Sequence, residues 1–160
     1  MTPTLPAVEW VETTDPPSGI TAELPGKVTV RKEAISIDGE IVDARAYGLD
    51  TPDGAVGFTV HDMPGDRYPL EDNLQRFRES YMQNTAEPLT SSNVRKVTFD
   101  GRPALDARLT STTDGEPVVG FIRLIADDTH FVQAVTLGPE ANEKALKAMH
   151  ERLLASLRVP

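Results

Sequence analysis

The stretch VRKVTFDGRPALDARLTSTTDGEPVVGFIRLIADDTHFVQAVTL, residues 94–137, predicts four consecutive strands. They are expected at residues 94–99, 104–112, 118–126 and 130–137. Connectors of only a few residues separate them, two of which begin with Asp-Gly, and links this short force neighbouring strands to be antiparallel. The last two strands are apolar at both alternating sets of positions, which is typical of strands buried on both faces. The stretch therefore predicts a meander within a sheet that is covered on both sides.

The N-terminal half shows a similar alternation. Apolar residues occur at positions 20, 22, 24, 28 and 30, around a Pro25-Gly26 turn. The alternating set then shifts to Ile35 and Ile37, which predicts a bulge near Lys32–Glu33. Asp38-Gly39 predicts a hairpin because these residues readily adopt positive φ.

Two helices complete the predicted architecture. The first is expected at residues 70–85 and carries the apolar stripe Leu70, Leu74, Phe77 and Tyr81. The second is expected at about residues 140–157, with His150 on its solvated side. The predicted fold class is therefore α+β, a predominantly antiparallel sheet flanked by helices in an α/β/α sandwich. Residues 1–17, rich in proline, are predicted to form an N-terminal arm or linker, and residues 18–160 a single domain.

Several turn motifs occur in a characteristic order along the chain. A Leu-Pro-Gly-Lys turn at 24–27 is followed by an Asp-Gly hairpin, the first helix, DGRPAL at 100–105 and a closing helix that ends in SLR at 156–158. Over residues 9–158 this order resembles the PsbP-like α/β/α sandwich superfamily, including bacterial LpqN-type lipoproteins and DcrB-like envelope proteins. The resemblance implies a non-catalytic binding or accessory domain of the bacterial cell envelope. The chain has no cysteine, so the resemblance gives no basis for a lipid anchor.

Composition and charge exclude several classes of function. The net charge is −9, and residues 1–66 hold 12 acidic and 4 basic residues. Nucleic-acid binding needs clustered lysine and arginine, so nucleic acid is not expected as a partner. No apolar stretch approaches the roughly 20 residues of a membrane-spanning helix. No signal peptide is present as written, which leaves a cytoplasmic protein or an exported one whose signal was removed; the resemblance favours the second.

Few side chains stand out as functional candidates. The long connector between the last N-terminal strand and the first helix contains His61, Arg67 and Tyr68, residue types that are common at binding surfaces. Trp10 either anchors the arm by burial of its ring or serves as an exposed recognition residue, and the first interpretation is favoured. No serine nucleophile motif or phosphate-binding loop is present, so no catalytic residue, metal or cofactor is predicted.

Three hypotheses for function follow. The leading one is a non-catalytic binding or accessory domain of a bacterial, exported protein that contacts a protein or a ligand. The second is a carrier that holds a small apolar ligand between sheet and helix, which requires a pocket of several hundred Å³. The third is a metal-assisted hydrolase that uses His61, Asp62 and His130, and it requires those side chains to converge.

Overall fold

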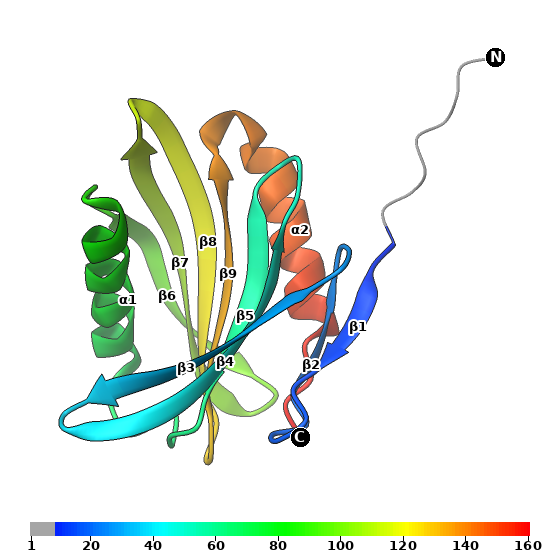
Figure 1. Cartoon of the computed structure of the whole chain (residues 1–160), viewed down its shortest axis with the longest axis vertical. Coiled ribbons are helices and arrows are strands. Elements are labelled where there is room, and N and C mark those ends of the chain that lie inside the picture. Colours follow the sequence, from blue (N-terminus) through cyan, green and yellow to red (C-terminus); the bar gives the residue numbers. More distant parts are fainter. Residues whose placement is uncertain (1–8) are drawn as a thin grey trace.

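The computed structural model describes residues 9–160. Within them, seven strands form one antiparallel sheet in the order β3-β4-β5-β9-β8-β7-β6, and β1 pairs with β2 in a separate hairpin (Figure 1). No helix in this part of the chain is long and apolar enough to cross a membrane. The elements are β1 (Val11–Thr14), β2 (Thr21–Leu24), β3 (Thr29–Ile37), β4 (Glu40–Asp50), β5 (Ala55–His61), α1 (Leu70–Thr85), β6 (Thr90–Phe99), β7 (Arg102–Thr113), β8 (Glu116–Ala126), β9 (Phe131–Pro139), a 3-10 turn (Glu140–Asn142) and α2 (Glu143–Ser156).

The meander predicted for residues 94–137 is confirmed. Strands β6, β7, β8 and β9 pair with one another in chain order, and β5 pairs with β9 to join the N-terminal strands to the meander. The Asp-Gly pairs at 38–39, 100–101 and 114–115 have φ values between 46° and 83°. Positive φ at both central residues is the requirement of a type I′ hairpin, so all three turns are built as the sequence indicates.

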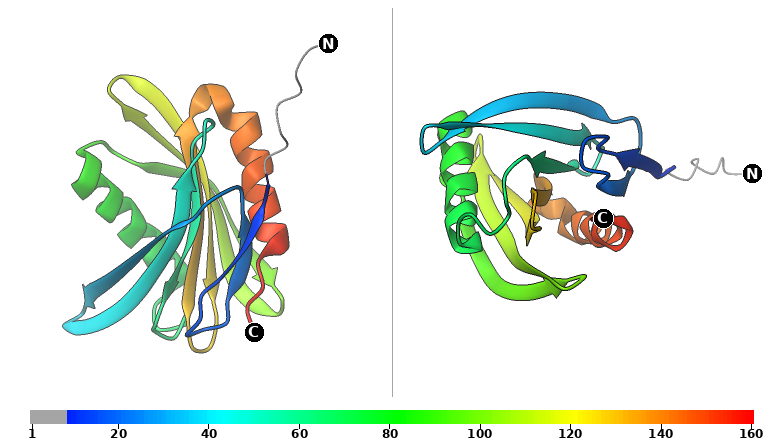
Figure 2. Two further views of the ribbon diagram at one scale, coloured as in Figure 1. Left: turned by 45° about the vertical axis from the view of Figure 1, so that its right-hand side comes forward. Right: turned by 90° about the horizontal axis from the view of Figure 1, so that it is seen from below.

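The two helices lie on opposite faces of the sheet (Figure 2). Helix α2 packs on a cluster that includes Phe58, Val132 and Leu153. Helix α1 packs on a second cluster that includes Leu105 and Ile122. Strands β8 and β9 contribute alternate residues to both clusters, which explains why they are apolar at both sets of positions. The predicted α+β fold class and its helix-covered sheet are confirmed.

The bulge predicted near Lys32–Glu33 is wrong. The pairing of β3 with β4 is continuous from Thr29 to Ile37. The apolar positions shift because the two ends of β3 are covered on different faces: Val28 packs on the α2 side and Ile37 on the α1 side. The irregular pairing in the sheet lies instead in β6, between Ser92 and Arg95.

Part of the predicted arm, residues 9–17, contains strand β1 and the turn that follows it. The rest of the predicted arm, residues 1–8, lies outside the described part of the chain. Strand β1 pairs with β2, and the turn between them presents the fully buried carboxylate of Asp15. That carboxylate accepts hydrogen bonds from Nε of Arg45 at 2.6 Å and from the Tyr47 hydroxyl at 2.5 Å. The other side of the Arg45 guanidinium donates to both carboxylate oxygens of Asp62, at 2.8 and 2.7 Å. One arginine therefore joins the β1–β2 hairpin to the main sheet.

Hydrogen bonds keep this buried cluster ionised. Burial alone would raise the pKa of Asp15, but the bonds from Arg45, Ser18 and Tyr47 outweigh it and hold the pKa below its usual value. The hydrogen bond from Arg45 likewise lowers the pKa of Asp62. Burial and the neighbouring carboxylate raise the pKa of Tyr47 to about 12, so its hydroxyl stays a donor.

The expectation that His150 is solvated is wrong. The side chain is buried, and its Nδ1 lies 2.9 Å from the hydroxyl of Thr136 on β9. His150 is four residues after Leu146 and three before Leu153, so it shares their face of α2. Burial lowers the pKa of His150 to about 4, with Asp106 opposing the shift and Arg123 adding to it.

Replacing the buried carboxylate of the cluster tests its role. Asp15→Asn removes the charge that Arg45 and Tyr47 bind, and we expect it to lower the free energy of unfolding by about 2–4 kcal/mol in urea titrations. The matched control is Asp128→Asn, which changes an exposed aspartate in a turn. Equal stability of the two variants would contradict the role assigned to the cluster.

The buried histidine predicts a pH dependence of stability. Between about pH 6.5 and 4 the unfolded chain binds a proton at His150 that the folded chain excludes. The free energy of unfolding should therefore fall as the pH drops through this range, by up to about 1.4 kcal/mol per pH unit. His150→Gln should reduce this slope in urea titrations at pH 7, 6 and 5, while His61, whose pKa burial also lowers, keeps its own contribution. An unchanged slope would show that His150 does not titrate in this way.

Candidate functional site: a groove between the sheet and α1

Helix α1 covers only part of its face of the sheet. It packs over β7 and β8, whereas the β3–β4 hairpin meets the start of α1 at its tip and diverges from the helix beyond it (Figure 2). Between the helix and strands β3, β4, β5 and β9 lies a groove of about 570 Å³. This volume lies within the range that is usual for small-molecule sites. The pocket required by the ligand-carrier hypothesis is therefore present.

Small residues form the floor of the groove. Ala46, Ala55 and Thr59 line it, and Gly48 pairs directly with Gly57 across β4 and β5. A Cβ at Gly57 would lie 2.4 Å from the carbonyl oxygen of Tyr47, so a larger residue does not fit without a shift of the strands. The floor therefore consists of backbone and methyl groups, and the absence of large side chains leaves this face of the sheet recessed.

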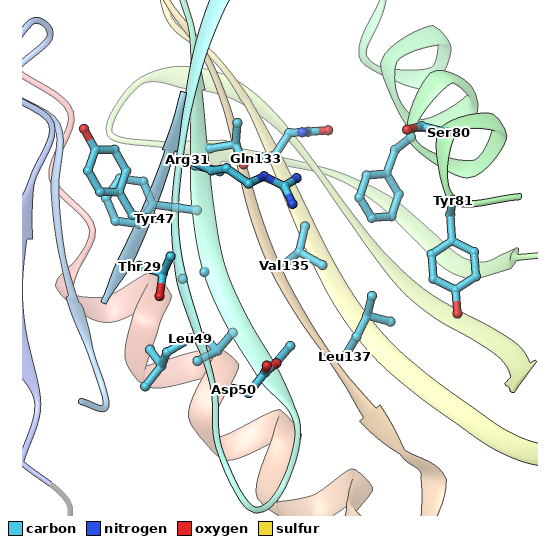
Figure 3. Close-up of a pocket in the computed structure, with 18 of the residues that line it drawn as sticks. Thr29, Arg31, Tyr47, Leu49, Asp50, Ser80, Tyr81, Gln133, Val135 and Leu137 are labelled. Atoms are coloured by element: carbon cyan, nitrogen blue, oxygen red, sulfur yellow. The ribbon is translucent and has the colours of Figure 1, made fainter. Parts of the chain in front are cut away.

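Larger apolar side chains form the walls (Figure 3). Val135 and Leu137 come from β9, and Phe77 and Tyr81 come from α1; all four are partly buried against the α1-side cluster. The stripe predicted for the first helix therefore serves two purposes: its N-terminal part packs on the sheet, and its C-terminal part borders the groove. An apolar body placed here would be in contact with aromatic rings on one side and aliphatic side chains on the other.

Two charged residues lie at different positions along the groove. Arg31 is paired with Ala46 across β3 and β4, whereas Asp50 is paired with Ala55 across β4 and β5. Four residues of β4, about 13 Å, separate the two positions. Among the described residues that line the groove, these two alone carry charge.

The predicted binding candidates Arg67 and Tyr68 lie outside the lining of the groove and form a clamp on the tip of the β3–β4 hairpin. Nη1 of Arg67 donates to Oε2 of Glu40 at 2.6 Å, and the Tyr68 hydroxyl donates to the carboxylate of Asp38. The guanidinium of Arg76 on α1 lies 3.8 Å from the centre of the Tyr68 ring. These contacts hold the tip of the β3–β4 hairpin beside the start of α1.

The three residues of the metal hypothesis do not converge. His61 is buried on the α1 side of the sheet beside Phe131, whereas Asp62 points to the opposite face, where it binds Arg45. Nε2 of His130 lies 3.5 Å from Asp62, so only two of the three groups are close together. Within residues 9–160 no group of three such ligands occurs, and the hypothesis that uses these residues is wrong.

His61 and Trp10 are both packed side chains. Burial lowers the pKa of His61, and its Nδ1 has no hydrogen-bond partner among the described residues. The ring of Trp10 is partly buried against the α2-side cluster, and the guanidinium of Arg152 lies 4.5 Å from its centre. Trp10 therefore lies on the face of the sheet opposite the groove.

Comparison with known proteins identifies the fold. No family model matches the sequence, and no curated protein matches it. The solution structure of cyanobacterial PsbP (CyanoP) from Synechocystis sp. PCC 6803 matches over 100% of this chain and 98% of that chain, with a TM-score of 0.66 and 12% identity. The fold is PsbP-like. A protein of unknown function from Pseudomonas aeruginosa matches over 94% of this chain and 98% of that chain, with a TM-score of 0.51 and 10% identity.

Within this PsbP-like fold, the groove is the feature whose residues the sequence predicts least well. Its floor has a signal in the sequence: Ala46 and Gly48 on one strand and Ala55 and Gly57 on the next are small residues at alternate positions. Two neighbouring strands with this pattern indicate a face that lacks large side chains. The position of Arg31 beside this floor depends on the register of β3 with β4 and has no such signal.

The clamp predicts a local change in hydrogen exchange. Tyr68→Phe removes the hydroxyl that binds Asp38 but keeps the ring beneath Arg76. We expect amide exchange at residues 37–41 to become faster by roughly three- to tenfold, with β7 and β8 unchanged as an internal control. Exchange that is unchanged at the hairpin tip would show that this bond does not hold the clamp.

Proposed function

We propose that this chain is a non-catalytic binding module that holds a small ligand with an apolar body in the groove between the sheet and α1. The observation that carries the proposal is the groove itself: about 570 Å³, with a floor of small residues and apolar walls. A PsbP-like fold supports an accessory role, since the likeness extends over nearly all of both chains. The proposal favours the carrier hypothesis within the broader class of binding and accessory domains.

The shape of the groove supports a small molecule over a broad protein surface. Its floor is recessed at Gly48 and Gly57, and its helix wall presents Phe77 and Tyr81. A slot between aromatic rings and an exposed backbone offers contact to both faces of a flat or chain-like molecule. Protein interfaces are generally wider and flatter, with about 800 Å² buried on each partner.

We also propose that the protein is bacterial and acts outside the cytoplasm, as the resemblance noted in its sequence suggests. Expression of the full-length gene product in its own host, followed by separation of cytoplasmic and envelope fractions, tests this part of the proposal. Recovery in the envelope fraction is the expected result, and recovery in the cytoplasm alone would contradict it.

Filling the groove tests the site. The neutral fluorescent probe N-phenyl-1-naphthylamine should bind at one saturable site, with an increase in fluorescence. Thr59 lies mid-floor, paired with Ala46 and Gln133. Thr59→Trp places a large ring in the groove and should weaken binding at least tenfold, because it removes the space and most of the apolar contact.

The control is Thr98→Trp, which adds the same ring at an exposed position on the edge strand β6. This variant should bind the probe as the unmodified chain does. Equal affinity of both variants, or no saturable binding to the unmodified chain, would contradict the proposed site.

A further inference from the structure

The groove has apolar walls and one cationic side chain, and together these two features indicate which kind of ligand it can bind. Arg31 lies on β3, an edge strand, on the same face of the sheet as the floor residue Ala46. Figure 3 shows its side chain extended over the floor towards Val135 and Gln133 of β9. The inference that follows rests on the proposed function, because it concerns the ligand of that same groove.

Arg31 has donors available for a ligand. Its one ion pair joins Nη2 to the carboxylate of Glu33 at 2.6 Å, and the arginine side chain is 75% exposed. A guanidinium carries five N–H donors, and no other hydrogen bond from Arg31 occurs within residues 9–160. An exposed ion pair of this kind contributes little to stability, so a ligand anion can share the guanidinium with Glu33 or replace it at low cost.

The second charged residue, Asp50, determines which way round an anionic ligand would lie in the groove. Asp50 repels an anion and lies about 13 Å further along β4 than the position opposite Arg31. Between the two lie Gly48, Gly57 and the apolar walls. A ligand with one anionic end would therefore place that end at Arg31 and its apolar body over the glycine floor.

The net charge of −9 gives an anionic ligand no attraction at long range. Salt screens the field of the whole chain beyond roughly 8 Å at physiological ionic strength, so repulsion at long range does not prevent binding. Selectivity for an anion must come from donors that touch it. A charge-assisted hydrogen bond to a guanidinium is roughly twice as strong as a neutral one.

We propose that the groove selects apolar molecules with a carboxylate or sulfonate group, and that Arg31 binds this group. The chemistry of the site defines this class of ligand. Its members have a flat or chain-like apolar body and one anionic end, and the other end can be uncharged.

Two probes that share one skeleton test this proposal. 8-Anilinonaphthalene-1-sulfonate carries an anionic group, and N-phenyl-1-naphthylamine is the same skeleton without it. In fluorescence titrations we expect the sulfonate to bind the unmodified chain roughly five- to twentyfold more tightly than the neutral probe. Arg31→Gln should abolish this preference, because it weakens binding of the sulfonate much more than binding of the neutral probe.

The controls separate this proposal from the proposed function. Lys144→Gln removes an exposed positive charge on α2, on the opposite face of the sheet, and should leave the preference intact. Equal binding of the two probes, or a loss of preference that is the same in both variants, would overturn the role of Arg31 while leaving the groove as the site. If neither probe binds, or if Thr59→Trp leaves both affinities unchanged, the proposed function fails with it.

Discussion

A seven-stranded sheet is wider than one helix, and this constraint shapes both faces of the molecule. Seven strands span roughly 29 Å, whereas a helix with its side chains is about 10–12 Å across. Each face carries one helix, so each has strands that no helix covers. On the α2 side the β1–β2 hairpin fills the remaining space with Ile20, Ala22 and Leu24. On the α1 side no second hairpin among the described residues covers the remaining strands. Because these strands carry glycine and alanine, a groove lies beside the helix.

The β1–β2 hairpin on the α2 side is held in place by ion pairs as well as by apolar packing. Arg45 places its guanidinium between Asp15 of the hairpin turn and Asp62 at the end of β5, and Tyr47 adds a hydroxyl donor. If the hairpin moved away, the buried guanidinium of Arg45 would lose the carboxylate of Asp15, and an unpaired buried charge strongly destabilises a fold. This ion pair therefore holds the hairpin in place. The strands that hold this cluster on one face form the floor of the groove on the other, because alternate residues of β4 and β5 point to opposite sides. The Arg45 cluster therefore lies behind the floor of the groove, on the opposite face of the same strands.

The sequence was a good guide to the elements and a poor one to the site. The turn chemistry of Asp-Gly and the stripe from Leu70 to Tyr81 are local signals, and they predicted the meander and the first helix. The shift from Val30 to Ile35 predicts a bulge that the structure does not contain, because the face on which an edge strand is covered changes along its length, which is a tertiary property. Arg67 and Tyr68 are binding candidates by residue type, and in the structure both side chains contact the β3–β4 hairpin. The floor of the groove has a local signal in its alternating small residues, but its helix wall depends on where α1 lies relative to the sheet, and no window of sequence contains that information.

The most direct test of the account is to map a bound probe onto the sheet by nuclear magnetic resonance. Amide and methyl shifts of the isotope-labelled chain are recorded as N-phenyl-1-naphthylamine is added. The account predicts that the largest changes occur at Gly48, Gly57, Thr59 and Val135, with Tyr81 affected on the helix side. Changes concentrated around Trp10 and α2, on the opposite face, would contradict the assignment of the groove as the binding site.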